Sequence, residues 1–151
     1  MTKLHIKFRN PKKDEEIELA EIRARAMKDS LINTGRFDEN RVRKRLLDTY
    51  DDKNTVIIEF KSTVIGFYSI QENIEEYYLN HLYIDLPYQN KGFGKIILDY
   101  IKEKYNQKDI KLNALKGSLA NNFYIKNCFI KIMEDDFDNY YVYKNKCLLV
   151  E

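Results

Sequence analysis

A loop with two closely spaced glycines, between a predicted strand and a predicted helix, constrains the fold of this chain most. The segment EYYLNHLYID predicts a strand over residues 76–85, and apolar residues three or four positions apart predict a helix over residues 92–105. Gly92 and Gly94 lie at the junction. Glycine lets the backbone approach a ligand closely with its N–H groups turned outward. Because a helix N-terminus also carries partial positive charge, the junction is predicted to hold a phosphate or pyrophosphate group.

Two familiar phosphate-binding motifs do not fit this loop. A P-loop requires GxxxxGK followed by Ser or Thr, and the chain has no such segment. A dinucleotide-binding fingerprint requires a third glycine near position 97, which is Ile97. Lys91 and Lys95 add positive charge to the loop. A tight turn that binds no ligand is the alternative interpretation.

The remaining patterns predict an α/β (α+β) domain in which helices flank a central sheet. Strands are predicted over residues 3–9, 55–60, 63–70, 109–115, 129–134 and 140–144. Helices are predicted from residue 14 to a break at 33–36, from an N-cap at Asp38 onward, and from a cap at Ser118 to about residue 127. Lys61-Ser62 fits a tight hairpin between two of the strands.

The predicted helices carry apolar positions that are expected to face the core. Asp38 and the pair Leu46 and Leu47 define the start and the buried side of the second helix. Leu119 and Phe123 are expected to face inward in the short helix. In the first helix the expected apolar stripe is formed by Ile17, Ala20, Ala24, Met27 and Leu31.

Length and charge indicate one domain and argue against several classes of protein. The 151 residues are expected to form a single domain, residues 1–151. The net charge is +2, from 26 basic and 24 acidic residues, so no nucleic-acid partner is expected. No segment approaches the roughly 18 consecutive apolar residues of a membrane-spanning helix, so no membrane partner is expected. The first ten residues lack the apolar run of a signal peptide, which predicts a cytoplasmic location.

Cysteine and histidine are too scarce for a metal or disulfide framework. The chain has two cysteines, Cys128 and Cys147, and two histidines, His5 and His81. The cysteines are too far apart in sequence for a CxxC site. We therefore expect neither a structural disulfide network nor a metal cofactor.

The glycine loop resembles the acetyl-CoA loop of the GCN5-related N-acetyltransferases, the GNAT superfamily. That loop reads Gln or Arg, two residues, Gly, one residue, then Gly or Ala. Gln89, Gly92 and Gly94 match it in register. The order of predicted elements is also similar over nearly the whole chain. The resemblance implies a mixed, mostly antiparallel sheet whose fourth and fifth strands splay apart to admit the cofactor.

A second GNAT signature lies about thirty residues further on. The family has an alanine, a tyrosine four residues later, and then Gly-Phe; here Ala120, Tyr124 and Phe129 match. Gly117 replaces a frequent asparagine, for which Asn121 and Asn122 can compensate one turn later. Cys128 replaces the glycine, and cysteine tolerates a left-handed helix end poorly.

The resemblance implies direct transfer of an acetyl group from acetyl-CoA to a primary amine of a small molecule or protein, within a ternary complex. Backbone groups of Leu82, Tyr83 and Ile84 would contact the cofactor and polarise the thioester carbonyl. Asn121 and the loop would complete the cofactor site. The loop residues implied are Gln89, Asn90, Lys91, Gly92, Phe93, Gly94 and Lys95.

Three residues are candidates for the proton transfers. The amine must lose a proton before it attacks, because an alkylammonium of pKa ~10 has no lone pair. His81 is one candidate base, and Glu76, acting through a water that Asn80 orients, is the other. Tyr124 stands where the family often places the tyrosine that protonates the departing thiolate.

The acceptor is implied to enter beside residues 33–37, where Arg36 and Phe37 are candidate contacts, and beside the acidic turn 134–138. The acidic residues favour a cationic acceptor, whereas Arg36 favours a carboxylate or phosphate. Both remain open. A non-catalytic acyl-CoA-binding module is the alternative function, and edge strands allow a homodimer.

Overall fold

The computed structural model describes residues 5–145, which form a mixed seven-stranded sheet with four α-helices. The strands follow the order β1-β2-β3-β4-β5-β7-β6 across the sheet. They are β1 (Ile6–Arg9), β2 (Thr55–Phe60), β3 (Thr63–Glu72), β4 (Glu76–Ile84), β5 (Asp109–Leu115), β6 (Ile130–Glu134) and β7 (Asp138–Tyr143). The helices are α1 (Glu16–Asn33), α2 (Glu39–Thr49), α3 (Phe93–Lys104) and α4 (Ala120–Lys126), with a short 3₁₀ turn, η2 (Leu86–Tyr88). The predicted fold class and element order are confirmed.

The strand pairing is mostly antiparallel, with one parallel pair. β1–β2, β2–β3, β5–β7 and β6–β7 are antiparallel, and β4–β5 is parallel. The predicted hairpin between β2 and β3 is confirmed, since Lys61 and Ser62 have φ angles of 51° and 68°. Two consecutive left-handed residues produce the twist that antiparallel neighbours require.

The chain divides into two compact units. Of the described residues, the first unit contains 5–69 and 81–94, and the second contains 70–80 and 95–145. β3, β4 and α3 each contribute residues to both. No helix in the described range is long and apolar enough to cross a membrane.

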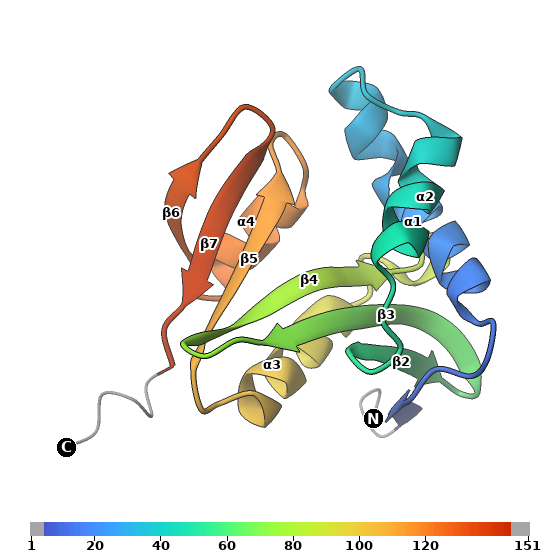
Figure 1. The fold of residues 1–151 in the computed structure, drawn as a ribbon, viewed down its shortest axis with the longest axis horizontal. Coiled ribbons are helices and arrows are strands. Elements are labelled where there is room, and N and C mark those ends of the chain that lie inside the picture. Colours follow the sequence, from blue (N-terminus) through green and yellow to red (C-terminus); the bar gives the residue numbers. More distant parts are fainter. Residues whose placement is uncertain (1–4, 146–151) are drawn as a thin grey trace. The chain divides into compact units, whose positions relative to one another are not determined.

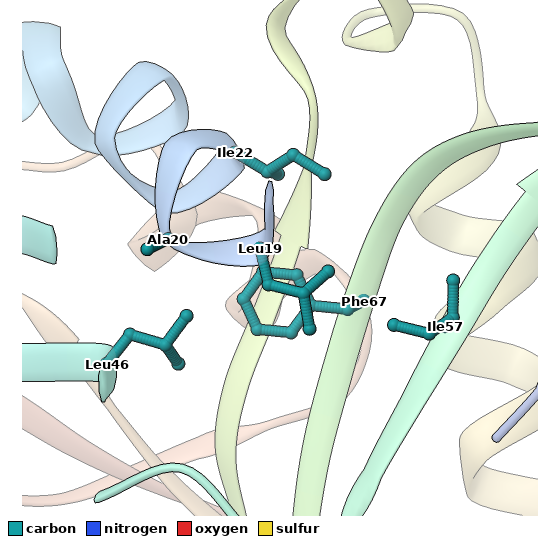
Figure 2. Packing of buried hydrophobic residues seen from close by; sticks show 6 residues of the cluster. All are labelled: Leu19, Ala20, Ile22, Leu46, Ile57 and Phe67. Atoms are coloured by element: carbon teal, nitrogen blue, oxygen red, sulfur yellow. The ribbon is translucent and has the colours of Figure 1, made fainter. Parts of the chain in front are cut away.

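The core of the first unit forms where α1 and α2 cover β2 and β3. Figure 2 shows Leu19 of α1 and Leu46 of α2 facing Phe67 and Ile57 of the sheet. The expected stripe of α1 is wrong at its start, since the side chain of Ile17 is 62% exposed. The buried face instead includes Leu19, Ile22 and Arg23, because α1 packs against both the sheet and α2.

Two further inward-facing predictions are wrong. Leu47 of α2 is exposed, and Leu46 alone of that pair is buried. Leu119 is 83% exposed because it precedes the first turn of α4 rather than lying within it. In α4 the buried side chain is Tyr124.

The second unit is built on β5, β7 and β6, which lie side by side in that order (Figure 1). Its core includes Leu98 and Ile101 of α3 and Ile110 and Leu112 of β5. β6 lies at the end of the sheet, and all five of its residues are exposed.

Helices α1 and α4 end in the same hydrogen-bond pattern. After α1, Arg36 N–H donates to Leu31 O (2.8 Å) and Gly35 N–H donates to Ile32 O (3.0 Å), with Gly35 at φ +72°. After α4, Phe129 N–H donates to Tyr124 O (3.0 Å) and Cys128 N–H donates to Ile125 O (3.2 Å), with Cys128 at φ +73°. Both are Schellman motifs, which normally place glycine at the left-handed residue. Cys128 therefore holds a conformation that is unfavourable for a side chain.

Replacing Cys128 with glycine is expected to stabilise the protein by about 1 kcal/mol, because glycine adopts positive φ without the clash of a Cβ. Urea denaturation would show this as a higher midpoint with an unchanged slope. Cys128→Ala is the control, since alanine keeps the Cβ. Equal stability of the two variants would contradict strain at this residue.

Candidate active site

The glycine loop has the geometry of an anion-binding turn. Asn90 and Gly92 have φ angles of 61° and 86°, and α3 begins at Phe93. A Cβ built on Gly92 has no heavy atom within 4 Å, apart from its chain neighbours. The first N–H groups of a helix have no acceptor within the helix, so this turn can accept a pyrophosphate.

Hydrogen bonds fix the segment that leads into the loop. Gln89 donates from Nε2 to the carbonyl oxygen of Ile84 at 2.8 Å. Asp85 accepts from the N–H of Leu86 at 2.8 Å, and Arg25 of α1 donates to both of its carboxylate oxygens, at 2.8 and 2.9 Å. The side chain of Gln89 therefore positions the loop.

Phe93 anchors the other end of the loop. Its side chain is 4% exposed and meets Phe60 of β2 edge-on, with ring centroids 4.9 Å apart. A shallow hollow beside it is lined by Phe60, Pro87, Tyr88, Lys91 and Phe93. Because the ring of Phe93 is buried, only its backbone is available to a cofactor.

The two lysines of the loop differ. Lys95 pairs with Asp99 one helical turn away, at 2.8 Å. Lys91 is exposed and pairs with no carboxylate of residues 5–145. Lys91 is therefore the loop cation available to a phosphate.

Gly66 lets β3 and β4 approach closely within the first unit. A Cβ at this position would lie 2.2 Å from the carbonyl oxygen of Tyr83 and 3.2 Å from Cα of Ile84. Since both are backbone atoms, any larger residue would displace a strand. Gly66 thus fixes the backbone of two predicted cofactor contacts. Gly66 was not among the predicted residues, although a glycine inside an apolar strand often marks close backbone approach.

A chain of polar side chains joins β4 to α1 in the first unit. The Nδ1 atom of His81 lies 3.4 Å from the hydroxyl of Tyr83, and that hydroxyl accepts a hydrogen bond from Nε of Arg23 at 3.2 Å. Arg23 also donates from Nη1 to the carbonyl oxygen of Val42 at 2.5 Å. The sequence did not single out Arg23, although it lies one residue from a predicted stripe position, Ala24.

Burial and the positive charge of Arg23 lower the pKa of His81 from 6.5 to about 4. The imidazole is therefore neutral at pH 7 and free to accept a proton. Such a low pKa also makes the imidazole a weak base. The environment of His81 therefore supports a role as the general base less strongly than an ordinary histidine pKa would.

The folded protein is expected to lose stability as the pH falls from about 6.5 to about 4. The unfolded chain protonates His81 near pH 6.5, whereas the folded chain does so near pH 4. The contribution of neutral His81 to the free energy of unfolding is fully present above pH 6.5. By pH 4 this contribution has fallen by up to about 3 kcal/mol. Urea denaturation of the wild type and of His81→Gln across this pH range checks the prediction, because all other titratable groups are the same in the two proteins. An identical pH dependence of the two proteins would contradict the result.

Tyr124 lies within an aromatic cluster of the second unit. It is 7% exposed, and its ring centroid lies 5.4 Å from those of Phe123 and Phe129 and 6.4 Å from that of Tyr141. The ring is therefore held firmly by packing.

The side chain of Asn121 is engaged within the second unit. Its Nδ2 atom donates to the carbonyl oxygens of Leu115 and Ser118, at 2.9 and 3.0 Å. Its Oδ1 atom accepts from Tyr141 and Asn139, at 2.7 and 3.0 Å. These bonds orient the start of α4, so a direct cofactor contact is not the evident role of this amide.

β4 and β5 pair over only part of their length. Their parallel pairing joins Glu76–Asp109 through Tyr78–Lys111, and Leu79 and Asn80 make no further pair with β5 in the second unit. Within the second unit the parallel pairing thus ends after three residue pairs, as the predicted splay of these strands requires. Glu76 is half-buried at the paired end and accepts a hydrogen bond from Asn73 at 3.0 Å. Asn80 is exposed beyond it.

The predicted acceptor contacts lie in different units. Arg36 and Phe37 are half-buried in the first unit, where the ring of Phe37 lies 5.8 Å from Nζ of Lys28. In the acidic turn of the second unit, hydrogen bonds from Lys116 and Lys131 lower the pKa of Glu134 to about 2. Asp135 accepts from the hydroxyl of Tyr140 at 2.7 Å. Neighbouring donors thus engage two of these acids, which weakens the case for a cationic acceptor.

Comparison with known proteins agrees with this geometry. Residues 16–143 match the model of the acetyltransferase (GNAT) domain family. A comparison with curated protein sequences found no significant match.

Several solved structures are similar over nearly the whole chain. PaiA N-acetyltransferase from Thermoplasma acidophilum, in complex with coenzyme A, is 20% identical with a TM-score of 0.76, over 92% of this chain and 98% of that chain. An acetyltransferase from Thermus thermophilus is 14% identical with a TM-score of 0.73, over 94% and 98%. The ribosomal-protein-S18-alanine N-acetyltransferase from Escherichia coli is 13% identical with a TM-score of 0.69, over 93% and 94%. Together with the match to the family model, the sheet and its glycine loop show that the chain belongs to the GNAT acetyltransferase family.

Proposed function

We propose that residues 1–151 act as one acetyl-CoA-dependent N-acetyltransferase domain that acetylates a primary amine of a small molecule or protein. The observation that carries this proposal is the left-handed Gly92, with open space at its Cβ position, directly before α3. Backbone N–H groups of this loop would hold the pyrophosphate, with Lys91 as a cationic neighbour. A cytoplasmic location, without nucleic-acid or membrane partners, completes the proposal.

The chain's own residues would manage the protons of the reaction. Acetyl-CoA, when bound, supplies an activated acetyl thioester. Backbone groups of Leu82, Tyr83 and Ile84 would bind it and polarise its carbonyl. His81, or Glu76 through a water oriented by Asn80, would remove the proton of the amine. Tyr124 would protonate the departing thiolate.

Release of free coenzyme A over a panel of amines tests this function. Turnover with at least one primary amine is expected, and initial-rate lines with both substrates varied should intersect, as direct transfer requires. Cys128 is exposed, so Cys128→Ser tests the competing acetyl-cysteine route. Parallel lines, with acetyl label trapped on Cys128, would contradict direct transfer.

A non-catalytic acyl-CoA-binding module is the second candidate, favoured by the low pKa of His81. Such a protein would gain thermal stability from acetyl-CoA yet release no coenzyme A with any amine. The two functions are therefore separated by running the binding and turnover measurements on one preparation.

We also propose that the protein forms a homodimer through the edge of β6. Among residues 5–145 no strand pairs with the outer edge of β6, and the side chains of Ile130, Ile132 and Met133 are exposed, as in an edge strand that pairs with a second copy. Sedimentation analysis is expected to show a dimer for the wild type and a monomer for Ile132→Lys. A monomeric wild type would refute the dimer.

A further inference from the structure

Arg23 is a buried cation without an acidic partner in the described chain. Its side chain lies on α1 within the first unit, and the residue is 7% exposed. Three other arginines of this unit pair with carboxylates: Arg9 with Glu15 and Glu59, Arg25 with Asp85, and Arg43 with Glu21. Among residues 5–145, Arg23 has no such partner. Burying a charge without a counterion is strongly unfavourable, so this arrangement requires an explanation.

The guanidinium of Arg23 has N–H donors that bond to no described residue. It has five N–H bonds, of which one goes to the hydroxyl of Tyr83 and one to the carbonyl oxygen of Val42. Both acceptors are neutral, and Nη2 donates to no described group. The fully buried side-chain atoms without a partner in the described residues are Tyr50 Oη and Asn139 Oδ1. Nη2 is not one of them, so this atom, which has no partner among the described residues, keeps some solvent-accessible area.

The position of Arg23 links it to the proposed chemistry. The hydroxyl of Tyr83 that accepts from Arg23 also lies 3.4 Å from Nδ1 of His81. A group bound at Nη2 would therefore be tied, through one hydroxyl, to a candidate base on β4. The guanidinium fork matches the planar carboxylate and the oxygens of phosphate, and it repels an ammonium group.

We propose that Arg23 binds an oxyanion of the acceptor, so that the substrate is a primary amine that also carries a carboxylate or phosphate group. This inference rests on the proposed acetyltransferase function. It favours an anion over a polyamine as the acceptor, because two of the acidic residues that suggested a polyamine, Glu134 and Asp135, are engaged by neighbouring donors. Arg23 thereby acts as a specificity-determining residue.

Matched pairs of amines test the proposal. Lysine and cadaverine differ only in the carboxylate, as do tyrosine and tyramine, and phosphoethanolamine differs from ethanolamine only in the phosphate. For the wild type, kcat/KM is expected to be about 10- to 100-fold higher for the anionic member of at least one pair, and mainly through KM. The pair that shows this preference identifies whether the protein recognises a carboxylate or a phosphate.

Variants assign the preference to Arg23. Arg23→Met keeps an apolar chain of similar length and should abolish the preference, whereas Arg45→Met, at an exposed arginine of α2, should keep it. Arg23→Lys keeps the positive charge but lacks the forked guanidinium, so it should retain part of the preference for the anionic amine. If Arg23→Met does not fold, Tyr83→Phe, which removes one acceptor of the guanidinium, should weaken the preference instead.

Calorimetric titration of the same pairs without acetyl-CoA tests the oxyanion site at Arg23 separately from the proposed acetyltransferase function. If lysine or another anionic member binds more tightly than its partner while no amine is acetylated, the acetyltransferase proposal fails and the oxyanion site stands. Three results would overturn the inference: equal use of both members of every pair, a preference for the members that lack the carboxylate or phosphate, or a preference for the anionic members that persists in Arg23→Met.

Discussion

Replacing Gly92 with glutamate is expected to abolish the binding of acetyl-CoA while leaving the protein folded. The added side chain finds open space, since no neighbouring atom lies within 4 Å of the Cβ position. It would place a negative charge where the turn at φ +86° presents its N–H groups to a pyrophosphate. Charge repulsion and the filled space act together, so we expect affinity to fall by at least about 100-fold. Thermal stabilisation by acetyl-CoA measures the loss.

Gly35 offers a matched control for this substitution. It has φ +72°, also with no atom within 4 Å of its Cβ position, but it ends α1 rather than preceding α3. Gly35→Glu should therefore cause similar backbone strain, about 1–2 kcal/mol, without weakening acetyl-CoA binding. If Gly92→Glu is stabilised by acetyl-CoA as much as Gly35→Glu, the loop is not the pyrophosphate site.

Local patterns were sufficient to predict the elements of the fold, because each depends on residues close in sequence. Lys61-Ser62 forms the hairpin that its position between two strand patterns indicated, and Asp38 caps α2 by accepting from Arg41 N–H at 3.1 Å. The errors lie in the orientation of helix faces. Ile17 and Leu119 are apolar residues at helix starts, where the face turned to the core depends on partners distant in sequence.

The candidate site was predictable where a backbone conformation demanded glycine, and less so where side chains meet. Gly92 could be identified because its φ angle is set by the local turn. The contact between Gly66 and Tyr83 and the burial of Arg23 join segments far apart in sequence, so no local pattern contains them. Gln89 was predicted as a cofactor contact of the loop, and its side chain bonds the carbonyl oxygen of Ile84, a contact that only the fold reveals.

Removal of one hydroxyl, in Tyr124→Phe, is expected to lower kcat by about 10²–10⁴-fold with little change in acetyl-CoA affinity. A thiolate that leaves without a proton remains a good nucleophile and returns to the acetyl group, so the loss of its proton donor slows the forward reaction. The ring contacts with Phe123, Phe129 and Tyr141 survive the substitution, because phenylalanine keeps the ring. Steady-state kinetics, with acetyl-CoA binding measured in parallel, separate turnover from affinity.

Tyr140→Phe is the matched control, since it also removes one tyrosine hydroxyl from the second unit. That hydroxyl donates to Asp135 at 2.7 Å, and we expect its removal to leave kcat unchanged. A fall in kcat for Tyr124→Phe alone would support the tyrosine as the proton donor, because both variants lose the same group. If Tyr124→Phe turns over like the wild type, the thiolate must take its proton from another group or from water, and Tyr124 serves only to pack α4 against β7.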